Sequence, residues 1–280
     1  MRKLIRKIDA VAANDGDGVK IHRIAGRQIN SVLDPFLMVD EINSDDAADY
    51  IGGFPEHPHR GFETITYMKT GRMRHRDHMG NEGVIEAGGV QWMTAGKGVL
   101  HSEMPEQSNG LLHGFQIWLN LPANEKMKPA AYRDIQSESV TELNLKQGGL
   151  VRVVAGNLKV DGVELIGPLP PLSTEPVMLD VVLNSTESVE LEFNQQNTAL
   201  VYVYGGNLSE GSSGGLKSRQ MGVFSNGDVL KLQGGGEGAK VLVFSGKALN
   251  EPIVQYGPFV MNTVEEVEQA FQDYRQNKLV

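Results

Sequence analysis

Two short segments hold side chains whose types and spacing suit a metal ion. His57-Pro-His59 and His101-Ser-Glu103 each place two potential ligands at positions i and i+2. Side chains two residues apart on a β-strand point to the same face, so each segment presents a pair of ligands to one side. Two such strands side by side would offer three imidazoles and one carboxylate, which suits iron, zinc, copper or nickel. The alternative is four polar residues in surface loops, but two pairs set in glycine-rich, β-like sequence favour the metal.

Short strands between glycine turns must position these ligands. The chain has 280 residues and 33 glycines, and the glycines separate runs rich in Val, Ile, Thr, Tyr and Phe. Short strands with closely spaced turn signals are typical of an all-β barrel or sandwich. The clearest runs are residues 64–68, 115–119, 151–154, 200–204 and 240–244.

One helix is expected, near the end of the chain. Thr263 and Glu266 have the spacing of a capping box, with Thr at the N-cap and Glu at N3. The apolar residues that follow recur at helical spacing on one face, namely Val264, Val267, Phe271 and Tyr274. We therefore predict a short C-terminal helix that packs on a barrel.

The chain divides into two β-rich halves that resemble each other weakly. Pro122, Pro129 and a polar run over residues 137–142 mark the break. We predict a metal-binding barrel over residues 1–130 and a second barrel over residues 131–280 that ends in the helix. All seven histidines lie at or before residue 113, so the second barrel lacks metal ligands and is expected to be structural, a lid, or a surface for a partner.

Charge and composition restrict the classes of partner. With 35 acidic and 26 basic residues the formal net charge is −9, which argues against direct binding of nucleic acid. Cysteine is absent, so every metal ligand must be a nitrogen or oxygen donor. The basic N-terminus is interrupted by charge before an apolar signal segment forms, and no run is long enough to span a membrane. We expect a cytoplasmic protein.

Four segments together resemble the pirin family of the cupin superfamily. Residues 53–67 resemble the first cupin motif, and residues 92–104 resemble the second motif in the form that pirins use. Residues 34–41 and 113–122 also resemble pirin signatures. The resemblance is strong over residues 34–122 and implies an all-β bicupin, in which two antiparallel jelly-roll barrels face each other. It also implies one mononuclear metal in the N-terminal barrel.

The resemblance implies which residues bind the metal. His57, His59 and His101 match the three imidazole ligands, and Glu103 matches the fourth ligand of pirins. Many other cupins use the Glu of the first motif, here Glu63. Strand alternation does not decide between them, because Glu63 lies an even number of residues from His59 and Gly61 can host a bulge. We favour Glu103, with Glu63 as a supporting residue or a base that faces the substrate.

Iron is the metal that the resemblance implies. Three neutral imidazoles and one carboxylate leave two positions open on an octahedral ion, which suits non-haem Fe(II). Zinc is satisfied by four ligands and would give a closed, structural site. Copper, nickel, cobalt and manganese remain alternatives.

Pirins suggest two functions of different classes. Some members have quercetin 2,3-dioxygenase activity, which implies O₂-dependent ring opening of a small, flavonol-like aromatic substrate. In that reaction Glu103 or Glu63 would accept the hydroxyl proton of the substrate. The alternative is an iron-binding, redox-sensing regulator of transcription or of a metabolic enzyme, which would act through a protein partner without significant turnover.

The remaining histidines are expected to play no part at the metal. His75 and His78 lie in a charged segment that resembles a solvated strand edge or loop. His22 is expected to be exposed on a strand, and His113 to hydrogen-bond within the core.

Overall fold

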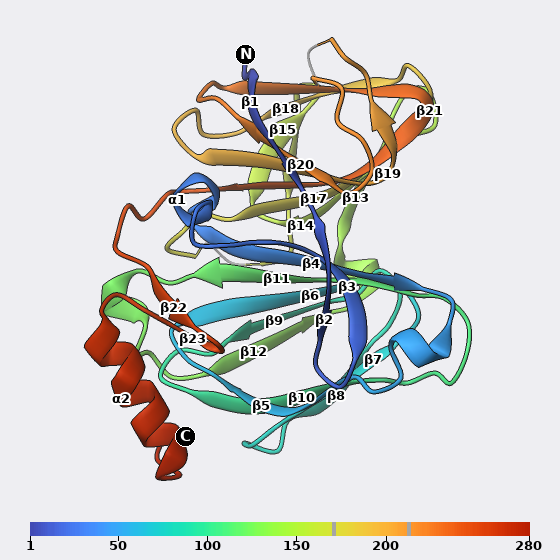
Figure 1. Cartoon of the computed structure of the whole chain (residues 1–280). Helices are drawn as coiled ribbons and strands as arrows, with labels where there is room; N and C mark the ends of the chain where they lie inside the picture. Colours follow the sequence, from blue (N-terminus) through green and yellow to red (C-terminus); the bar gives the residue numbers. More distant parts are fainter. Residues whose placement is uncertain (170–171, 212–213) are drawn as a thin grey trace. The chain divides into compact units, whose positions relative to one another are not determined.

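The computed structural model describes residues 1–169, 172–211 and 214–280, and most of their regular secondary structure is β-strand (Figure 1). These residues form two compact units. The histidine unit comprises Val11–Asn30, Phe36–Ser137 and Leu249–Val280, and it contains all seven histidines. The histidine-free unit comprises Met1–Ala10, Ser31–Pro35 and the described part of Glu138–Ala248.

The ends of the chain belong to different units from those expected for barrels over residues 1–130 and 131–280. Strand β1 (Leu4–Asp9) pairs with β20 (Gln220–Phe224), so the N-terminus extends the sheet of the histidine-free unit. Helix α2 (Val264–Arg275) contacts β22 (Val254–Tyr256) and β23 (Phe259–Met261) of the histidine unit. The sequence pattern predicted the helix, but the unit on which each chain end packs depends on long-range contacts.

The histidine unit contains three antiparallel sheets. The order of the seven-stranded sheet is β12-β9-β6-β11-β4-β3-β2, with strands β2 (Val11–Asp15), β3 (Val19–Ala25), β4 (Phe36–Ser44), β6 (Phe62–Thr70), β9 (Val90–Thr94), β11 (Leu112–Asn120) and β12 (Ala131–Ile135). The order of the four-stranded sheet is β5-β10-β7-β8, with strands β5 (Phe54–His59), β7 (Met73–Asp77), β8 (Glu82–Ile85) and β10 (Val99–Pro105). Strands β22 and β23 form a two-stranded ribbon.

An apolar cluster joins the two larger sheets of the histidine unit. Its members come from β3, β4, β6 and β11 on one side and from β7 and β8 on the other. Burial of these side chains fixes which face of each strand is internal, because neighbouring residues of a strand point to opposite faces. The buried members are Val19, Ile21, Ile42, Tyr50, Met68, Met73, Ile85 and Leu112.

The C-terminal segment packs closely against the turn between β5 and β6. Gly61 has a φ of 91°, and a Cβ at this position would lie 2.0 Å from the carbonyl oxygen of Val260. Lys126 is buried beside this turn and donates hydrogen bonds to the carbonyl oxygens of Gly61 (2.7 Å) and Val260 (3.1 Å). Burial lowers the pKa of Lys126 to about 8. Strand β23 is therefore fixed next to the strand that carries two of the predicted ligands.

The predicted C-terminal helix is confirmed, together with its capping box. Thr263 Oγ1 accepts a hydrogen bond from the Glu266 backbone, and the Glu266 carboxylate accepts one from the Thr263 backbone. Val267 and Ala270 are buried, and the ring of Phe271 packs edge-on against Phe259 at 4.8 Å. The predicted apolar stripe is buried only in part, since Val264 and Tyr274 are exposed.

The histidine-free unit has a larger and more uniformly apolar core. Its principal sheet has the order β1-β20-β19-β21-β17-β14-β13, and β15, β16 and β18 extend it. The remaining strands of this unit are β13 (Thr141–Asn144), β14 (Leu150–Ala155), β15 (Asn157–Val160), β16 (Val163–Ile166), β17 (Val177–Leu183), β18 (Ser188–Glu192), β19 (Thr198–Leu208) and β21 (Val229–Gly246). Helix α1 (Asn30–Leu33) and the 3₁₀ turns η1 (Ala47–Asp49), η2 (Ala123–Glu125) and η3 (Ser137–Ser139) complete the described elements.

The all-β prediction is confirmed. No helix in the described part of the chain combines the length and the apolar character that crossing a bilayer requires.

We predict that the ion pair between Arg60 and Asp273 holds α2 on the histidine unit. Arg60 Nη1 donates to Asp273 Oδ2 at 2.7 Å, and the Arg60 side chain is only 5% exposed. Substituting Asp273→Asn leaves a buried cation without its partner, so the free energy of unfolding should fall by about 1–3 kcal/mol. Thermal and denaturant unfolding measure the change, with Glu268→Gln on the exposed side of the same helix as the control.

The effect of Asp273→Asn should also depend on pH. Hydrogen bonding from Arg60 lowers the pKa of Asp273 below its ordinary value of 3.8. The stabilisation is therefore complete above pH 3.8 and is lost as the pH falls through the folded-state pKa. The difference between the native protein and the variant should be constant near neutral pH and shrink below 3.8, and a difference that grows in acid would contradict this assignment.

Candidate metal centre

Two antiparallel strands bring three imidazoles together. His57 and His59 lie on β5, and His101 lies directly opposite His57 on β10. One ring nitrogen of each histidine lies within 4.8 Å of the corresponding nitrogens of the other two. The ring centroids are 4.4 Å apart for His57 and His101, and 5.0 Å apart for His59 and His101. The i, i+2 spacing places His57 and His59 close together, and strand pairing adds His101 to the cluster. Their role as metal ligands stays a prediction.

An irregularity in β5 places Glu103 near this cluster. His101 pairs with His57, but Glu103 pairs with Phe54, so β5 advances one residue more than β10 between the two pairs. Such an extra residue bends a strand and re-aims its side chains. His101 and Glu103 remain on the same buried face of β10, and Glu103 lines a cavity together with His57 and His59.

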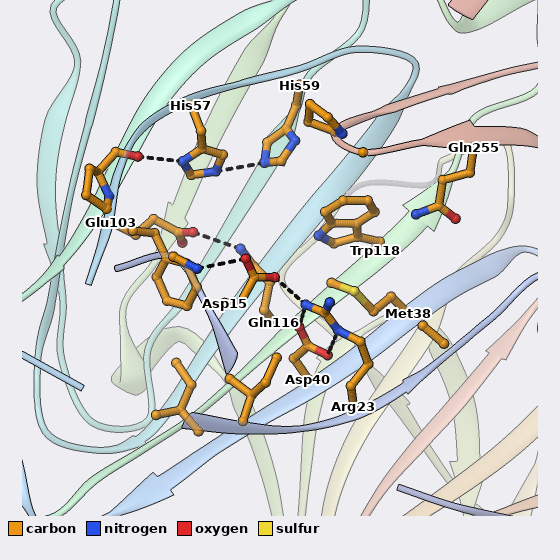
Figure 2. Close-up of a pocket in the computed structure, with 18 residues that line it drawn as sticks. Asp15, Arg23, Met38, Asp40, His57, His59, Glu103, Gln116, Trp118 and Gln255 are labelled. Carbon is orange, nitrogen blue, oxygen red and sulfur yellow. Dashed lines mark hydrogen bonds and ion pairs between the residues drawn. The ribbon is translucent and has the colours of Figure 1, made fainter. Parts of the chain in front are cut away.

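The backbone fixes the orientation of His57. Its Nδ1 lies 2.9 Å from the carbonyl oxygen of Pro55, which can only accept a hydrogen bond, so Nδ1 carries the proton. The other ring nitrogen, Nε2, points at Nε2 of His59, 3.0 Å away (Figure 2). A carbonyl that fixes the tautomer in this way is the usual support of a metal-binding imidazole.

The cluster contains buried nitrogens for which the described part of the chain supplies no hydrogen-bond partner. They are Nδ1 and Nε2 of His101. Burial, together with the charges of neighbouring histidines, lowers the pKa of both His59 and His101 well below the ordinary value of 6.5. Both rings are therefore neutral, which is the state that binds a metal. Unpaired nitrogens and neutral rings fit a bound cation.

Glu103 is held beside the imidazoles by two hydrogen bonds. Its Oε1 accepts from Thr66 Oγ1 at 2.7 Å, and its Oε2 accepts from Gln116 Nε2 at 2.8 Å. Its oxygens are not part of the cluster of mutually close ligand atoms. Each carboxylate oxygen has a second lone pair, so both remain able to bind a cation or a proton.

Glu63 lies in a different environment from Glu103. Glu63 and Thr66 are an odd number of residues apart on β6, so their side chains point to opposite faces. Glu63 accepts hydrogen bonds from Trp92 Nε1 (3.1 Å) and Thr94 Oγ1 (2.7 Å), and Lys128 Nζ lies 3.5 Å away. It is not among the described residues that line the cavity beside the imidazoles. The geometry therefore supports neither a ligand role nor a base role for Glu63.

A cavity of about 590 Å³ opens beside the imidazoles (Figure 2). Its apolar lining includes Ile21, Met38, Ile42, Phe54 and Trp118. Its polar lining includes His57, His59, Glu103, Gln116, Gln255 and an ion-pair group made of Asp15, Arg23 and Asp40. No sequence pattern predicts this last group, because its members lie on three strands and have no distinctive spacing.

The expectation that His75 is solvated was wrong. His75 is 2% exposed, lies 3.3 Å from Asp134 and stacks on Tyr132. The charged neighbours Arg74 and Arg76 misled the interpretation, because they point outward while His75 points inward. His78 is exposed, and His113 contacts the buried Glu41 at 3.1 Å, as expected of a core hydrogen bond.

Family models decide the relationship of this chain to known proteins. Residues 18–119 match the pirin family, and residues 178–280 match the pirin C-terminal cupin domain. The chain belongs to the pirin family. It is a pirin with two cupin domains and one short C-terminal helix, which confirms the predicted fold class.

Proteins similar to this pirin match it over nearly its whole length. A protein of Vibrio cholerae named "Putative quercetin 2,3-dioxygenase" is 45% identical over 98% of this chain and 96% of its own length. A protein of Pseudomonas aeruginosa with the same name is 47% identical over 95% of this chain and 94% of its own length. The crystal structure of quercetin 2,3-dioxygenase from Acinetobacter baumannii is 31% identical and superposes with a TM-score of 0.90 over 100% of this chain and 98% of that one.

We predict that His101→Ala abolishes stoichiometric metal binding by this pirin. Loss of a direct ligand should cost more than the roughly 10- to 100-fold loss of affinity typical of residues that only support a ligand. Titration calorimetry and elemental analysis after loading with Fe(II) measure the change. His78→Ala is the matched control, because His78 is an exposed histidine outside the cluster. Equal metal content in the two variants would contradict the site.

Removal of the metal should lower thermal stability without unfolding the protein. The histidine unit has an apolar core that does not involve the cluster, so chelation should leave its strands folded. Metal that binds only the folded state raises the melting temperature according to its concentration relative to Kd. Circular dichroism after chelation should show native strand content and a lower melting temperature, and an unfolded apoprotein would contradict this expectation.

Proposed function

We propose that this pirin is a metal-dependent dioxygenase that opens the ring of a flavonol-like substrate with O₂, as a quercetin 2,3-dioxygenase does. The observation that carries the proposal is a cluster of three imidazoles, of which His57 and His59 line a cavity of about 590 Å³. The names of two relatives and of one solved structure support the same chemistry.

The cavity has the size and the lining expected for a planar aromatic substrate. Pockets for small molecules commonly measure about 300–1,000 Å³ and combine apolar walls with a few polar groups. Met38 and Trp118 occupy paired positions on β4 and β11 and supply adjacent apolar surface. An aromatic ring placed over them would lie in the same cavity as His57 and His59.

Four side chains would hold the metal in this proposal. His57, His59 and His101 would supply imidazole nitrogens, and Glu103 would supply the fourth ligand. This nitrogen and oxygen donor set suits Fe(II), which would act as a Lewis acid and exchange electrons with the substrate and O₂. Metal analysis of the purified protein distinguishes iron from the alternatives zinc, copper, nickel, cobalt and manganese.

Glu103 is also the proposed proton acceptor. Thr66 and Gln116 hold its carboxylate in one orientation, with the side chain facing the cavity. A carboxylate oxygen of Glu103 would receive the proton of the substrate hydroxyl group as that oxygen becomes an enolate. In the overall reaction two C–C bonds of the heterocycle break, both atoms of O₂ enter the product, and carbon monoxide leaves.

Glu103→Gln should reduce oxygen uptake with quercetin by at least about 100-fold when compared at equal metal content. Gln keeps the shape of the side chain but is a far weaker proton acceptor and ligand. Glu63→Gln is the matched control, because it makes the same change in a buried carboxylate that faces away from the cavity. It should retain most of the activity.

An oxygen electrode and carbon monoxide detection on anaerobically Fe(II)-loaded protein provide the measurement. Full iron occupancy without oxygen uptake would overturn the enzyme assignment and favour a redox-sensing regulator that acts through a protein partner. Equal losses in Glu103→Gln and Glu63→Gln would overturn the role given to Glu103.

A further inference from the structure

A row of polar side chains crosses the sheet that forms one wall of the cavity. Arg23 on β3 pairs with Asp40 on β4, Asp40 pairs with Gln116 on β11, and Gln116 pairs with Thr66 on β6. Side chains at paired positions project from the same face of a sheet. Gln116 and Thr66 hold Glu103, so the row runs from the metal centre at one end to Arg23 at the other.

Arg23 is fixed in place but keeps hydrogen-bond donors for a ligand. Its Nε and Nη2 donate to the two carboxylate oxygens of Asp40 at 2.8 and 2.6 Å, and Nη2 also contacts Asp15. Within the described ranges, no atom accepts a hydrogen bond from Nη1 of Arg23. Figure 2 shows this group in the lining of the cavity, with the ion pairs to Asp40 and Asp15 drawn. A guanidinium with two free N–H bonds matches an oxyanion.

The two acidic partners of Arg23 differ in how easily a ligand could displace them from the guanidinium. Asp40 is 6% exposed and makes a two-point contact with the guanidinium, so it is a permanent counterion. Asp15 is 47% exposed, stands at the end of β2 and reaches Arg23 through one nitrogen only. An incoming oxyanion would therefore compete with Asp15 for the guanidinium.

We propose that Arg23 is a specificity-determining residue that binds a second oxyanion of the substrate, at the end of the molecule remote from the metal. The inference rests on the proposed function, in which the other end of the substrate lies at the three imidazoles. Because neighbouring strands are about 4.8 Å apart, β3 lies roughly 10 Å from β11 across the sheet. An extended ring system over Met38 and Trp118 would reach from the Glu103 end of the row to Arg23.

The chemistry of Arg23 suits two sources of oxyanion, a carboxylate and an acidic phenol. The proposal therefore predicts a preference for flavonols that carry either group at the end remote from the 3-hydroxyl. Asp15 acts as an internal competitor, so its removal should strengthen this preference. A merely structural role for Asp15 would not do so.

The test compares three ligands under nitrogen: 3-hydroxyflavone, its 4′-carboxylic acid and its 4′-hydroxy derivative. Binding is followed by quenching of tryptophan fluorescence, which reports on the cavity through Trp118, in protein with and without Fe(II). In the native protein the preferred acidic ligand should bind about tenfold more tightly than 3-hydroxyflavone. Whether the carboxylate or the phenol shows this preference identifies the source.

Three variants separate recognition from structural damage. Arg23→Gln should abolish the preference, and Asp15→Asn should increase it by about two- to fivefold. Because Arg23→Gln leaves Asp40 buried without a cation, the double variant Arg23→Gln/Asp40→Asn repeats the test with a neutral pair. Lys20→Gln is the matched control, since it removes one positive charge from the exposed side of the same strand and should leave the preference unchanged.

An unchanged preference in the folded Arg23 variants, or a weaker preference in Asp15→Asn, would overturn the proposal. Failure of the proposed function gives a different result, because oxygen uptake would then be absent with every flavonol while the affinity ratios in metal-free protein remained measurable.

Discussion

The burial of three imidazoles against one another is the constraint on which the site depends. A buried polar nitrogen without a partner costs free energy, and His101 has two such nitrogens among the described residues. Protonation would not relieve this cost, because burial and neighbouring histidines oppose a positive charge on the ring. A cation that accepts nitrogen ligands relieves it directly. The same features therefore suit the cluster to a metal ion.

Strand register then determines which other groups belong to the site. The additional residue in β5 changes the pairing from His101–His57 to Glu103–Phe54, and it leaves Glu103 facing the cavity. Thr66 and Gln116 complete the arrangement from the opposite sheet, since both donate to the Glu103 carboxylate. Side chains of one sheet therefore hold the Glu103 carboxylate of the other sheet beside the cavity.

The distribution of charge divides the cavity into two ends. At the imidazole end, burial lowers the pKa of His59 and His101 and so opposes a positive charge on these two rings. The opposite end carries one guanidinium and two carboxylates, of which Asp40 is buried and Asp15 is half exposed. Burial raises the pKa of Asp40 despite the opposing bond from Arg23, whereas Arg23 and the Gly16 backbone outweigh burial at Asp15 and lower its pKa. A ligand with one polar group at each end fits this division.

Local features of this protein could be predicted from its amino-acid sequence. The i, i+2 pairs His57/His59 and His101/Glu103, the glycine-separated strands and the capping box at Thr263 all depend on neighbouring residues, and local geometry fixes them. Long-range packing was needed to show that Glu103 rather than Glu63 faces the cavity, that His75 is buried, and to which unit each chain end belongs. It also brought Asp15, Arg23 and Asp40 together. Each of these outcomes depends on which strands pair and in which register, and register is set by burial over the whole sheet rather than by adjacent residues.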